Sequence, residues 1–324
     1  MQAPPRAGRY TKPHQNPRAA RPEWLRIRLA SGETYARYLQ LRSLVDELGL
    51  HTVCQEARCP NIHECWGAHG TATFMILGEV CTRRCGFCAV TSGRPTGVDA
   101  GEPRRVADAV ARLGLKHAVI TSVDRDDLPD GGAGHFASVI RAVHEMVDDC
   151  AVEVLTPDFK GHPDALDVVL DARPEVFSHN VETVARLYRA ARPGSHYEGS
   201  LALLAAAARR KAVHAERFRV KTGIMVGLGE TREEVAETVL DIRRAGVEVL
   251  TVGQYLQPTP GHLPVDRFYT PEEFSGIREE ALSLGFAHVE SGPLVRSSYH
   301  AHEHVSGHIS ARAAGPPIEQ EQMS

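Results

Sequence analysis

The sequence predicts an α/β fold built on a parallel sheet, because strand and helix patterns alternate along most of its 324 residues. Six short segments rich in β-branched residues have the length and composition of buried strands. They are TATFMILG (71–78), HAVITSV (117–123), AVEVLTP (151–157), EVFSHNV (175–181), FRVKTGIMVG (218–227) and EVLTVGQYL (248–256). Strands joined through helices form parallel sheets with right-handed crossovers. An open doubly wound sheet and a partial (β/α) barrel both fit this pattern.

Amphipathic segments typical of helices lie between and after the strands. One of them opens with Thr231 and has Glu234 three residues later, which is the pattern of a capping box. The helices we expect cover residues 106–114, 135–147, 162–172, 181–191, 200–214, 231–246 and 271–285.

Polar side chains follow several of the predicted strands. In either architecture the carboxyl ends of the strands form the active site, so these side chains should converge on one face. That convergence predicts an enzyme. The residues are Thr121, Ser122, Asp124, Ser178, Asn180, Lys221 and Gln254.

Composition and charge exclude several classes of protein. The net charge of −4 gives no basic field to attract nucleic acid or an anionic membrane. No apolar run approaches the roughly 20 residues that span a bilayer, and no secretory signal opens the chain. We therefore expect a cytoplasmic protein that binds neither nucleic acid nor membrane.

Two tails flank the predicted domain. Residues 1–21 contain five Lys and Arg residues and no acidic residue, so we expect a disordered tail. A mitochondrial transit peptide is the alternative, but the segment is poor in Ser and Thr and its prolines oppose an amphipathic helix. We expect a second flexible tail at 305–324.

The trio Cys81, Cys85 and Cys88 follows the first predicted strand with the spacing C-x3-C-x2-C. A loop this short can hold three corners of a 4Fe–4S cubane and leaves one iron open, whereas a ferredoxin site supplies four thiolates. The open iron can chelate the amino and carboxylate groups of a methionine moiety. The alternatives are a zinc knuckle without its fourth ligand, or a redox pair with a spare thiol.

The second trio, Cys54, Cys59 and Cys65, precedes the first strand with the spacing C-x4-C-x5-C. It again supplies three thiolates. A structural zinc site completed by a nearby histidine is the alternative to a cluster. The candidate histidines are His51, His63 and His69.

The motif CTRRCGFC (81–88) after a first strand resembles the signature of the radical S-adenosylmethionine (SAM) superfamily. This resemblance implies a full or partial (β/α) barrel, and here we expect a partial (β/α)6 barrel over 71–287. It also implies that Phe87 lies against the bound nucleotide. The cluster would supply an electron that cleaves SAM to a 5′-deoxyadenosyl radical, while the protein orients the substrate and excludes water.

Four motifs together resemble the lipoyl synthase family over about residues 22–302. The resemblance implies that the first trio binds an auxiliary 4Fe–4S cluster in an extension over 22–70. The fourth ligand would be a serine of a C-terminal segment over 288–304, Ser298 by preference and Ser297 otherwise. The motifs are CQEARCPNIHECW (54–66), CTRRCGFC (81–88), TSVDRDDLPDGGA (121–133) and RSSYHA (296–301).

The resemblance also implies the reaction. Two sulfur atoms would be inserted at C6 and C8 of an octanoyl chain on a carrier-protein lysine, with two SAM molecules consumed and the auxiliary cluster spent as sulfur donor. The implied partners are octanoylated lipoyl carrier domains (2-oxoacid dehydrogenase E2 subunits and glycine cleavage H protein), a reductant such as ferredoxin or flavodoxin, and an iron–sulfur carrier that rebuilds the cluster.

Other residues are weaker candidates. Lys221, expected at a strand end, could pair with the methionine carboxylate, or it could be an exposed lysine. Asn180 and Glu182 suit the ribose hydroxyls, although Glu182 could simply begin the next helix. The segment GIMVGLGE (223–230) resembles the superfamily's strand beside adenine. Histidines of HAHEH (300–304) could bind a metal, but we expect a solvated tail.

Rival functions have distinct signatures. A methylthiotransferase would carry a longer preceding domain and a basic RNA-binding end, and the N-terminal trio does not suit biotin synthase. A non-enzymatic iron–sulfur or zinc protein would not need six strands with polar ends.

Overall fold

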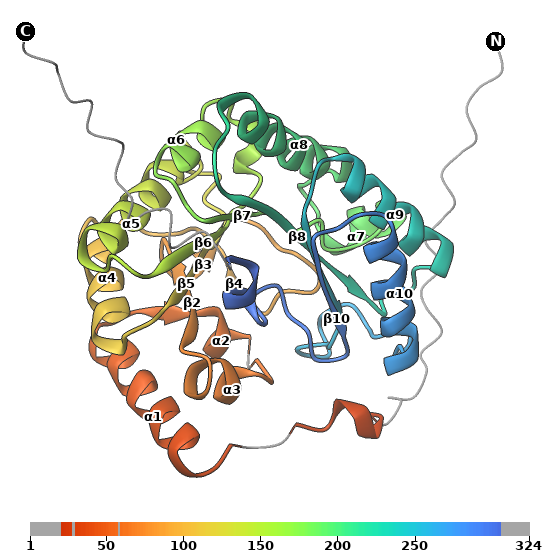
Figure 1. Ribbon diagram of the computed structural model, residues 1–324, viewed down its shortest axis with the longest axis horizontal. Coiled ribbons are helices and arrows are strands. Elements are labelled where there is room, and N and C mark those ends of the chain that lie inside the picture. The colour runs from red at the N-terminus through yellow and green to blue at the C-terminus, as the bar shows by residue number, and fades with distance from the viewer. Residues whose placement is uncertain (1–20, 28–29, 58, 306–324) are drawn as a thin grey trace, which may run out of the picture.

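The computed structural model describes residues 21–27, 30–57 and 59–305 of the chain (Figure 1). The two predicted tails lie outside these ranges, apart from residues 21 and 305.

An eight-stranded sheet forms the centre of the fold, with the strand order β1-β2-β5-β6-β7-β8-β9-β10. All neighbours from β2 to β10 are parallel, and β1 pairs antiparallel with β2. A separate two-stranded sheet pairs β3 (Val80–Cys81) with β4 (Thr91–Ser92). The strands of the main sheet are β1 (His51–Thr52), β2 (Thr71–Ile76), β5 (His117–Ser122), β6 (Ala151–Leu155), β7 (Val176–Ser178), β8 (Arg219–Val226), β9 (Val249–Gln254) and β10 (His288–Gly292).

The strand order decides between the two architectures that the sequence allowed. A doubly wound sheet reverses its strand order at a switch point, whereas this order follows the chain without reversal. The curved sheet has its larger helices on the outside (Figure 1), and β1 and β10 end the order without pairing to each other. A partial (β/α) barrel is therefore confirmed. Its outer helices are α4 (Glu102–Leu113), α5 (Ala133–Met146), α6 (Ala165–Asp171), α7 (Tyr188–Ala191), α8 (Tyr197–His214), α9 (Arg232–Arg244) and α10 (Pro271–Ser283).

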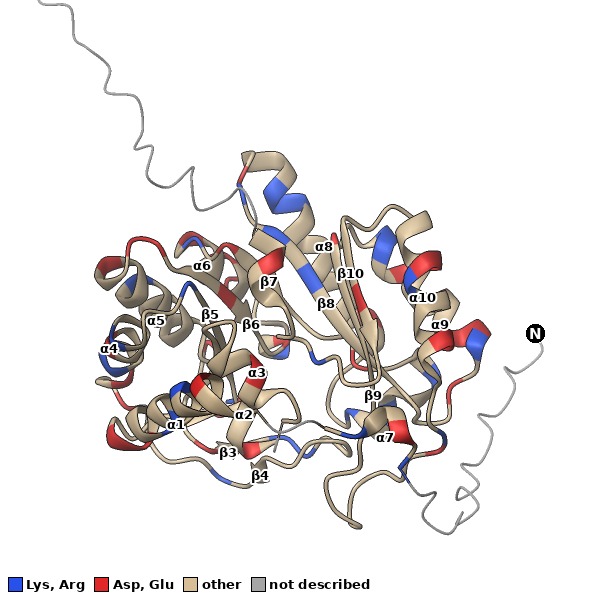
Figure 2. Cartoon of the chain, turned by 60° about the horizontal axis from the view of Figure 1, so that its bottom comes forward, with Lys and Arg blue, Asp and Glu red and all other residues tan. Residues whose placement is uncertain are grey.

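The outer helices bury an apolar face against the sheet and present charge outward. Acidic and basic side chains are interspersed on α4, α9 and α10 (Figure 2). The predicted capping box of Thr231 and Glu234 is present at the start of α9. None of the described helices is long and apolar enough to cross a membrane.

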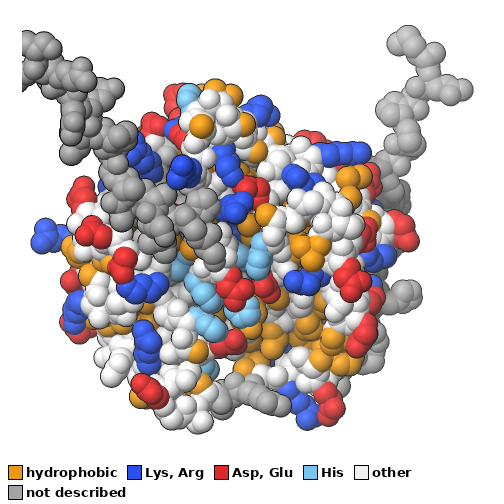
Figure 3. All heavy atoms as spheres, viewed as in Figure 1, with side chains coloured by type: hydrophobic (Ala, Val, Ile, Leu, Met, Phe, Trp, Pro, Cys, Tyr) orange, Lys and Arg blue, Asp and Glu red, His pale blue; other side chains and the backbone are white. Residues whose placement is uncertain are grey.

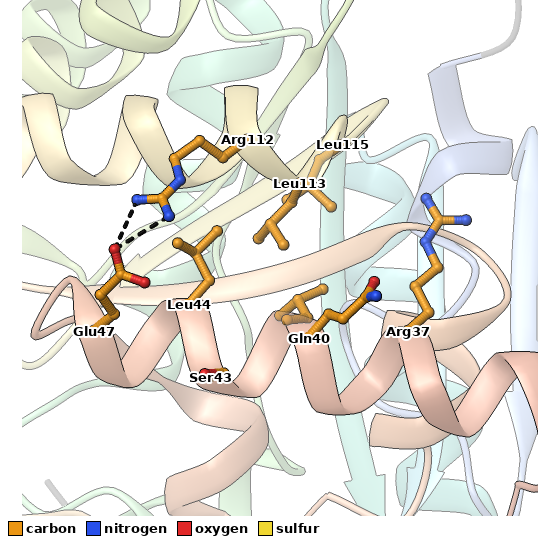
Figure 4. A pocket seen from close by; sticks show the side chains of 9 residues that line it. Arg37, Gln40, Ser43, Leu44, Glu47, Arg112, Leu113 and Leu115 are labelled. Carbon is orange, nitrogen blue, oxygen red and sulfur yellow. Dashed lines mark hydrogen bonds and ion pairs between the residues drawn. The ribbon is translucent and has the colours of Figure 1, made fainter.

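The N-terminal extension adds a layer of helices outside β2. Helix α1 lies beside α4, and the shallow groove between them is crossed by the ion pair between Arg112 and Glu47 (Figure 4). None of the six clustered cysteines lines this groove, so it is not the candidate site. The extension comprises η1 (Glu23–Leu25), α1 (Gly32–Glu47), α2 (Val53–Glu56) and α3 (Ile62–Gly67).

Two expected elements differ from the observed ones. The helix expected over 181–191 begins only at η3 (Ala185–Leu187), because Glu182 forms a parallel bridge with Ile224 and has a φ of 71°. The sheet also has a seventh parallel strand, β10, beyond the six predicted. Its sequence HVESG is too short and too polar to read as a strand.

The last described residues pack inside the molecule. Helix η4 (Ala301–Val305), the short blue turn near the centre of Figure 1, places Val305 against Ala151 and Val176 at the starts of β6 and β7. His304 is only 4% exposed. The expectation of a solvated tail at 300–304 is wrong, because this segment covers the amino ends of these strands.

Candidate functional site

The trio Cys81, Cys85 and Cys88 lies on the loop that follows β2, at the carboxyl ends of the strands. The Cys81 sulfur accepts hydrogen bonds from the backbone N–H groups of Arg83 (3.4 Å) and Asp124 (3.3 Å). The N–H of Gly86 donates to the carbonyl of Ala191 (2.8 Å). The loop is therefore tied both to the end of β5 and to the end of α7.

Arg83 is the main side-chain anchor of this loop. It is buried, and its guanidinium donates to Asp126 (2.8 and 2.9 Å), Asp158 (2.6 and 2.8 Å) and Ser195 (2.7 Å). Despite the burial of Asp158, its bonds to Arg83 hold the pKa of its carboxyl well below the usual range. Three acidic or polar groups from three different loops thus fix one residue inside the cysteine motif.

The loop after β5 supplies part of this anchor and also borders the trio, because the Cys81 thiol lies 3.7 Å from the Asp124 carboxylate. Arg125 pairs with Asp127 (2.8 Å) and donates to the carbonyls of Leu77 and Thr96. Gly131 and Gly132 have φ values of 61° and 91°, as expected for residues that supply unusual backbone angles.

Burial raises the pKa of all three thiols. It raises the pKa of Cys81 to about 11 and that of Cys85 to about 12, and it raises the pKa of Cys88 as well. A thiol must lose its proton to become a metal ligand, so binding of iron or another cation to this loop would release protons.

Asn180 and Glu182 lie together beyond the end of β7, near the cysteine loop. The Asn180 amide donates to Glu182 (3.1 Å), and the Asn180 carbonyl oxygen Oδ1 is buried with no hydrogen-bond partner among the described residues. Burial raises the pKa of Glu182, whose charge also acts on Cys85 and Cys88. Phe87 is partly exposed on the same loop. These groups can accept hydrogen bonds from a polar ligand beside the trio.

Arg192 is a site residue that sequence reasoning missed. It is 7% exposed and donates through Nη1 to the carbonyl of Asn180 (2.7 Å) and to the hydroxyl of Tyr188 (3.0 Å). Its positive charge lowers the pKa of Cys85 against the effect of burial. No sequence signal singles it out, because it follows a helix and not a strand.

The strand-end position expected for Lys221 is wrong. Lys221 is the third residue of the eight-residue strand β8 and is fully buried. Its ammonium pairs with Glu153 (2.7 Å) and contacts the His304 ring nitrogen Nδ1 (3.2 Å). Lys221 is therefore engaged near the amino ends of the strands, away from the cysteine loop, and does not face the ligand.

The second trio lines a small pocket together with residues of the C-terminal segment. The sequence analysis named the three cysteines and the serine, but not the other residues that line it. Segments more than 200 positions apart in the chain meet there, and Ser298 is among the lining residues while Ser297 is not. The Thr71 hydroxyl in the pocket is buried with no hydrogen-bond partner among the described residues. The lining residues are Cys54, Cys59, Asn61, Ile62, Cys65, Thr71, Thr73, Arg296, Ser298 and Tyr299.

The donor set of this pocket suits a metal cluster. Burial raises the pKa of Cys54 to about 11 and also raises the pKa of Cys59 and Cys65, with mutual repulsion of the thiolates adding to the effect at Cys65. Three thiolates so close together need cations to neutralise them. His51, His63 and His69 do not line the pocket, so none of them completes a zinc site there in this arrangement.

The C-terminal arm of the pocket is fixed by contacts to the extension and to the sheet. The Asn61 amide donates to the carbonyl of Leu294 (2.7 Å), and the Thr73 hydroxyl donates to Ser298 (3.0 Å). Gly253 in β9 faces the same arm, where a Cβ atom would overlap the carbonyl oxygen of Val295. Glycine at 253 is thus required for the approach of the serine segment.

The two cysteine sites lie toward opposite ends of one strand. Thr71 and Thr73 line the second pocket from the amino-terminal half of β2, whereas Cys81 follows its carboxyl end. Ile76 comes three positions after Thr73, which corresponds to roughly 10 Å along a strand.

Comparison with known proteins identifies the family. Residues 75–242 match the model of the radical SAM superfamily. The chain is 56% identical over 306 residues to the lipoyl synthase of Rubrobacter xylanophilus, covering 93% of this chain and 92% of that protein. It is also 56% identical over 292 residues to the lipoyl synthase of Symbiobacterium thermophilum, covering 90% of this chain and 89% of that protein. The chain belongs to the lipoyl synthase family.

Solved structures agree on the fold. The chain superposes on SuiB of Streptococcus suis bound to the precursor peptide SuiA with a TM-score of 0.54 at 10% identity, covering 82% of this chain and 54% of SuiB. With SuiB bound to S-adenosylmethionine the TM-score is 0.51 at 11% identity, covering 77% and 58%. Membership in the lipoyl synthase family makes this chain an enzyme, a radical SAM sulfurtransferase, and implies 4Fe–4S chemistry with SAM.

Two further arginines lie at these sites but were not predicted from the sequence. Arg83 stands inside CTRRCGFC, and the acid-rich DRDD (124–127) gave a signal for it, since a buried arginine needs carboxylate partners. Arg296 lines the second pocket and donates to the carbonyl of Val295 (2.6 Å). Its charge interacts with the Cys59 thiolate, so it can balance the negative charge of the trio.

Proposed function

We propose that this enzyme inserts two sulfur atoms at C6 and C8 of an octanoyl chain held on a lysine of a lipoyl carrier protein. The observation that carries the proposal is the pair of three-cysteine sites toward opposite ends of β2, the second of them approached by Ser298. A saturated chain has no acidic hydrogen, so acid–base catalysis cannot activate it. The reaction needs a radical source and a sulfur source in one cavity.

At the carboxyl end, Cys81, Cys85 and Cys88 would hold the first 4Fe–4S cluster and leave one iron without a protein ligand. When bound, that cluster supplies the electron that cleaves SAM to the 5′-deoxyadenosyl radical. The chain's own task is to position the loop through Arg83 and to exclude water with the buried strand residues.

The ligand groups for SAM would come from the residues around this loop. Phe87 would lie against the nucleotide, and Asn180 with Glu182 would accept hydrogen bonds from the ribose hydroxyls. We assign the methionine carboxylate to Arg192 instead of Lys221, because Arg192 acts on Cys85 and Glu182 while Lys221 is bound to Glu153.

At the other end, Cys54, Cys59, Cys65 and Ser298 would hold the auxiliary 4Fe–4S cluster, which would serve as the sacrificial sulfur donor. Oxygen is a poorer partner for iron than a thiolate, so Ser298 marks the iron that is released most easily. The Thr73 hydroxyl donates a hydrogen bond to the Ser298 oxygen, and this bond would stabilise negative charge on that oxygen. In this scheme the extension (22–70) and the C-terminal segment (288–304) form one functional unit on the barrel (71–287).

The partners follow from the reaction. The substrate is an octanoylated carrier domain of the E2 or H-protein type, a ferredoxin or flavodoxin provides electrons, and an iron–sulfur carrier restores the spent cluster. The cytoplasm suits this chemistry because its thiols stay reduced.

The direct test is product analysis. Anaerobically reconstituted protein is incubated with an octanoyl-lysine peptide, a reductant and SAM, and the peptide is weighed by mass spectrometry. Each C–H bond that is broken is replaced by a C–S bond, and under the reducing conditions of the assay each sulfur carries a proton, so we expect the mass to increase by two sulfur atoms. We expect about eight irons and eight sulfides per chain before turnover. An unchanged peptide, or about four irons, contradicts the proposal.

The serine assignment has a matched control in the neighbouring residue. Ser298→Ala removes the oxygen that lines the pocket, so sulfur insertion should fall at least tenfold while 5′-deoxyadenosine is still produced. Ser297→Ala, one residue away and outside the pocket lining, should insert sulfur normally. Equal activity of the two variants contradicts the assignment of Ser298.

Loss of a ligand from the first trio, Cys81, Cys85 and Cys88, should stop SAM cleavage, unlike loss of Ser298. Cys85→Ala should abolish 5′-deoxyadenosine formation and sulfur insertion together, because the first cluster loses a ligand. The iron content should fall to about four per chain, with the auxiliary cluster retained. Formation of 5′-deoxyadenosine by this variant contradicts the cluster assignment.

A further inference from the structure

Histidine and glutamate side chains form a second polar cluster beside the auxiliary pocket, outside both cysteine trios. Figure 3 shows histidines gathered near the centre of this face with carboxylates next to them. The cluster joins three parts of the chain: helix α3 with its following loop, strand β10 and the segment after Tyr299. Its members are Glu64, His69, His288, Glu290, His300, His302 and Glu303.

Three of these residues point their ligand atoms at one position. The carboxylate oxygen Oε1 of Glu64 lies 3.4 Å from Nε2 of His69 and 3.8 Å from Nε2 of His300. All three ligand atoms lie within 4.8 Å of one another. Ligands of a tetrahedral ion bound at about 2.0–2.1 Å are about 3.4 Å apart, so small side-chain rotations suffice to bind one ion.

Neighbouring groups surround these ligands, two carboxylates at ion-pair distance and the Tyr299 hydroxyl at hydrogen-bond distance. The second ring nitrogen of His300, Nδ1, faces Oε1 of Glu290 (3.7 Å) and Oε1 of Glu303 (4.0 Å). A carboxylate on the far nitrogen of a histidine fixes the tautomer that presents the other nitrogen to a metal. The Tyr299 hydroxyl donates to Glu64 (3.2 Å).

The ring of His69 packs against a neighbouring histidine. It stacks on His302 with a centroid distance of 5.0 Å and an interplanar angle of 20°. The Nδ1 of His302 is buried with no hydrogen-bond partner among the described residues. Simple surface ion pairs do not need such ordered surroundings and contribute little to stability.

We propose that Glu64, His69 and His300 bind one divalent transition-metal ion, either zinc or ferrous iron. Two imidazoles and one carboxylate suit tetrahedral zinc with one open position, and they also form the facial triad typical of ferrous iron. The ion ties α3, next to Cys65, to the segment that follows Ser298. It thus holds the two arms of the auxiliary pocket together independently of any cluster, and the proposal stands whether or not the proposed function is correct.

The test is a calorimetric titration of the anaerobic holoenzyme, with both clusters in place and loosely bound metal removed by a chelator. Zn²⁺ and Fe²⁺ are titrated separately. We expect one ion per chain, and the ion that binds more tightly is the resident one. Glu64→Gln and His69→Gln should each weaken binding at least tenfold, consistent with loss of one direct ligand.

His214→Gln is the matched control, because His214 is an exposed histidine at the end of α8, and this variant should bind the ion as the wild type does. The visible absorbance of the clusters shows that each variant keeps its fold and its clusters. The proposal is overturned if neither ion binds at one per chain, or if both ligand variants bind as tightly as the control.

Discussion

The two cysteine sites differ in how the chain assembles them. The radical loop takes its three thiols from eight consecutive residues, Cys81 to Cys88, and is anchored by Arg83. The auxiliary pocket takes three thiols from an extension and its oxygen from Ser298, more than 200 residues later. The first trio is local in the chain, although its anchor Arg83 depends on carboxylates of the loops after β5 and β6, whereas the second site exists only when the C-terminal segment has docked. Removing the anchor of one site should therefore impair that site and leave the other intact.

Loss of the Arg83 anchor should have the largest effect. In Arg83→Met the carboxylates of Asp126 and Asp158 keep their burial but lose their main cation, which costs about 3–5 kcal/mol. We expect a lower melting temperature of the anaerobic holoenzyme, loss of 5′-deoxyadenosine production, and iron reduced to about four per chain.

Arg112→Met is the control for this variant, because Arg112 forms only surface ion pairs with Glu47 and Asp108. It should melt close to the wild type and keep both clusters. If Arg83→Met retains full SAM cleavage, the loop does not depend on this anchor and the contrast between the sites is wrong.

Gly253→Ala should damage only the auxiliary site. The added methyl group overlaps the carbonyl of Val295 and displaces the segment that carries Ser298. Overpacking of this kind costs about 1–3 kcal/mol. Sulfur insertion should fall several-fold in the peptide assay while 5′-deoxyadenosine production continues.

Gly276→Ala in α10 is the matched control, because a Cβ atom there meets nothing within 4 Å. It should keep both activities and melt at the wild-type temperature or slightly above, since alanine favours helix. Equal loss of both activities in Gly253→Ala would show that the two sites are not separable.

A smaller, pH-dependent effect should come from His179, beside Asn180 at the radical end. Burial lowers its pKa to about 3, and the neutral ring donates to the carbonyl of Thr156 (2.9 Å) and accepts from Ser200 (2.8 Å). The unfolded histidine binds a proton below about pH 6.5, whereas the folded one stays neutral. The free energy of unfolding should therefore decrease as the pH falls from about 6.5 toward 3, by on the order of 1 kcal/mol per pH unit from this residue.

His179→Asn removes that titration but keeps a donor near Thr156. The variant should be less stable at pH 7.5, with a shallower decrease of stability between pH 6.5 and pH 5, measured by denaturant unfolding at each pH. A slope identical to the wild type would show that His179 contributes nothing to the acid sensitivity of the radical end.

The sequence by itself determined the alternation of strands and helices, the two cysteine trios and the RSSY serines, because these signals are local in spacing and composition. Its resemblance to a known family then selected the partial barrel. The position of Lys221 was misjudged because strand ends are hard to place from composition, and a buried ammonium paired with Glu153 leaves no local signal.

Only the tertiary structure decided which serine reaches the pocket, which arginines hold the loops, and that His304 of HAHEH is buried. Those outcomes depend on contacts between residues far apart in the chain, such as Thr73 with Ser298 and Glu64 with Tyr299. Their geometry is fixed by packing, in which the absence of one methyl group at Gly253 lets two distant segments meet.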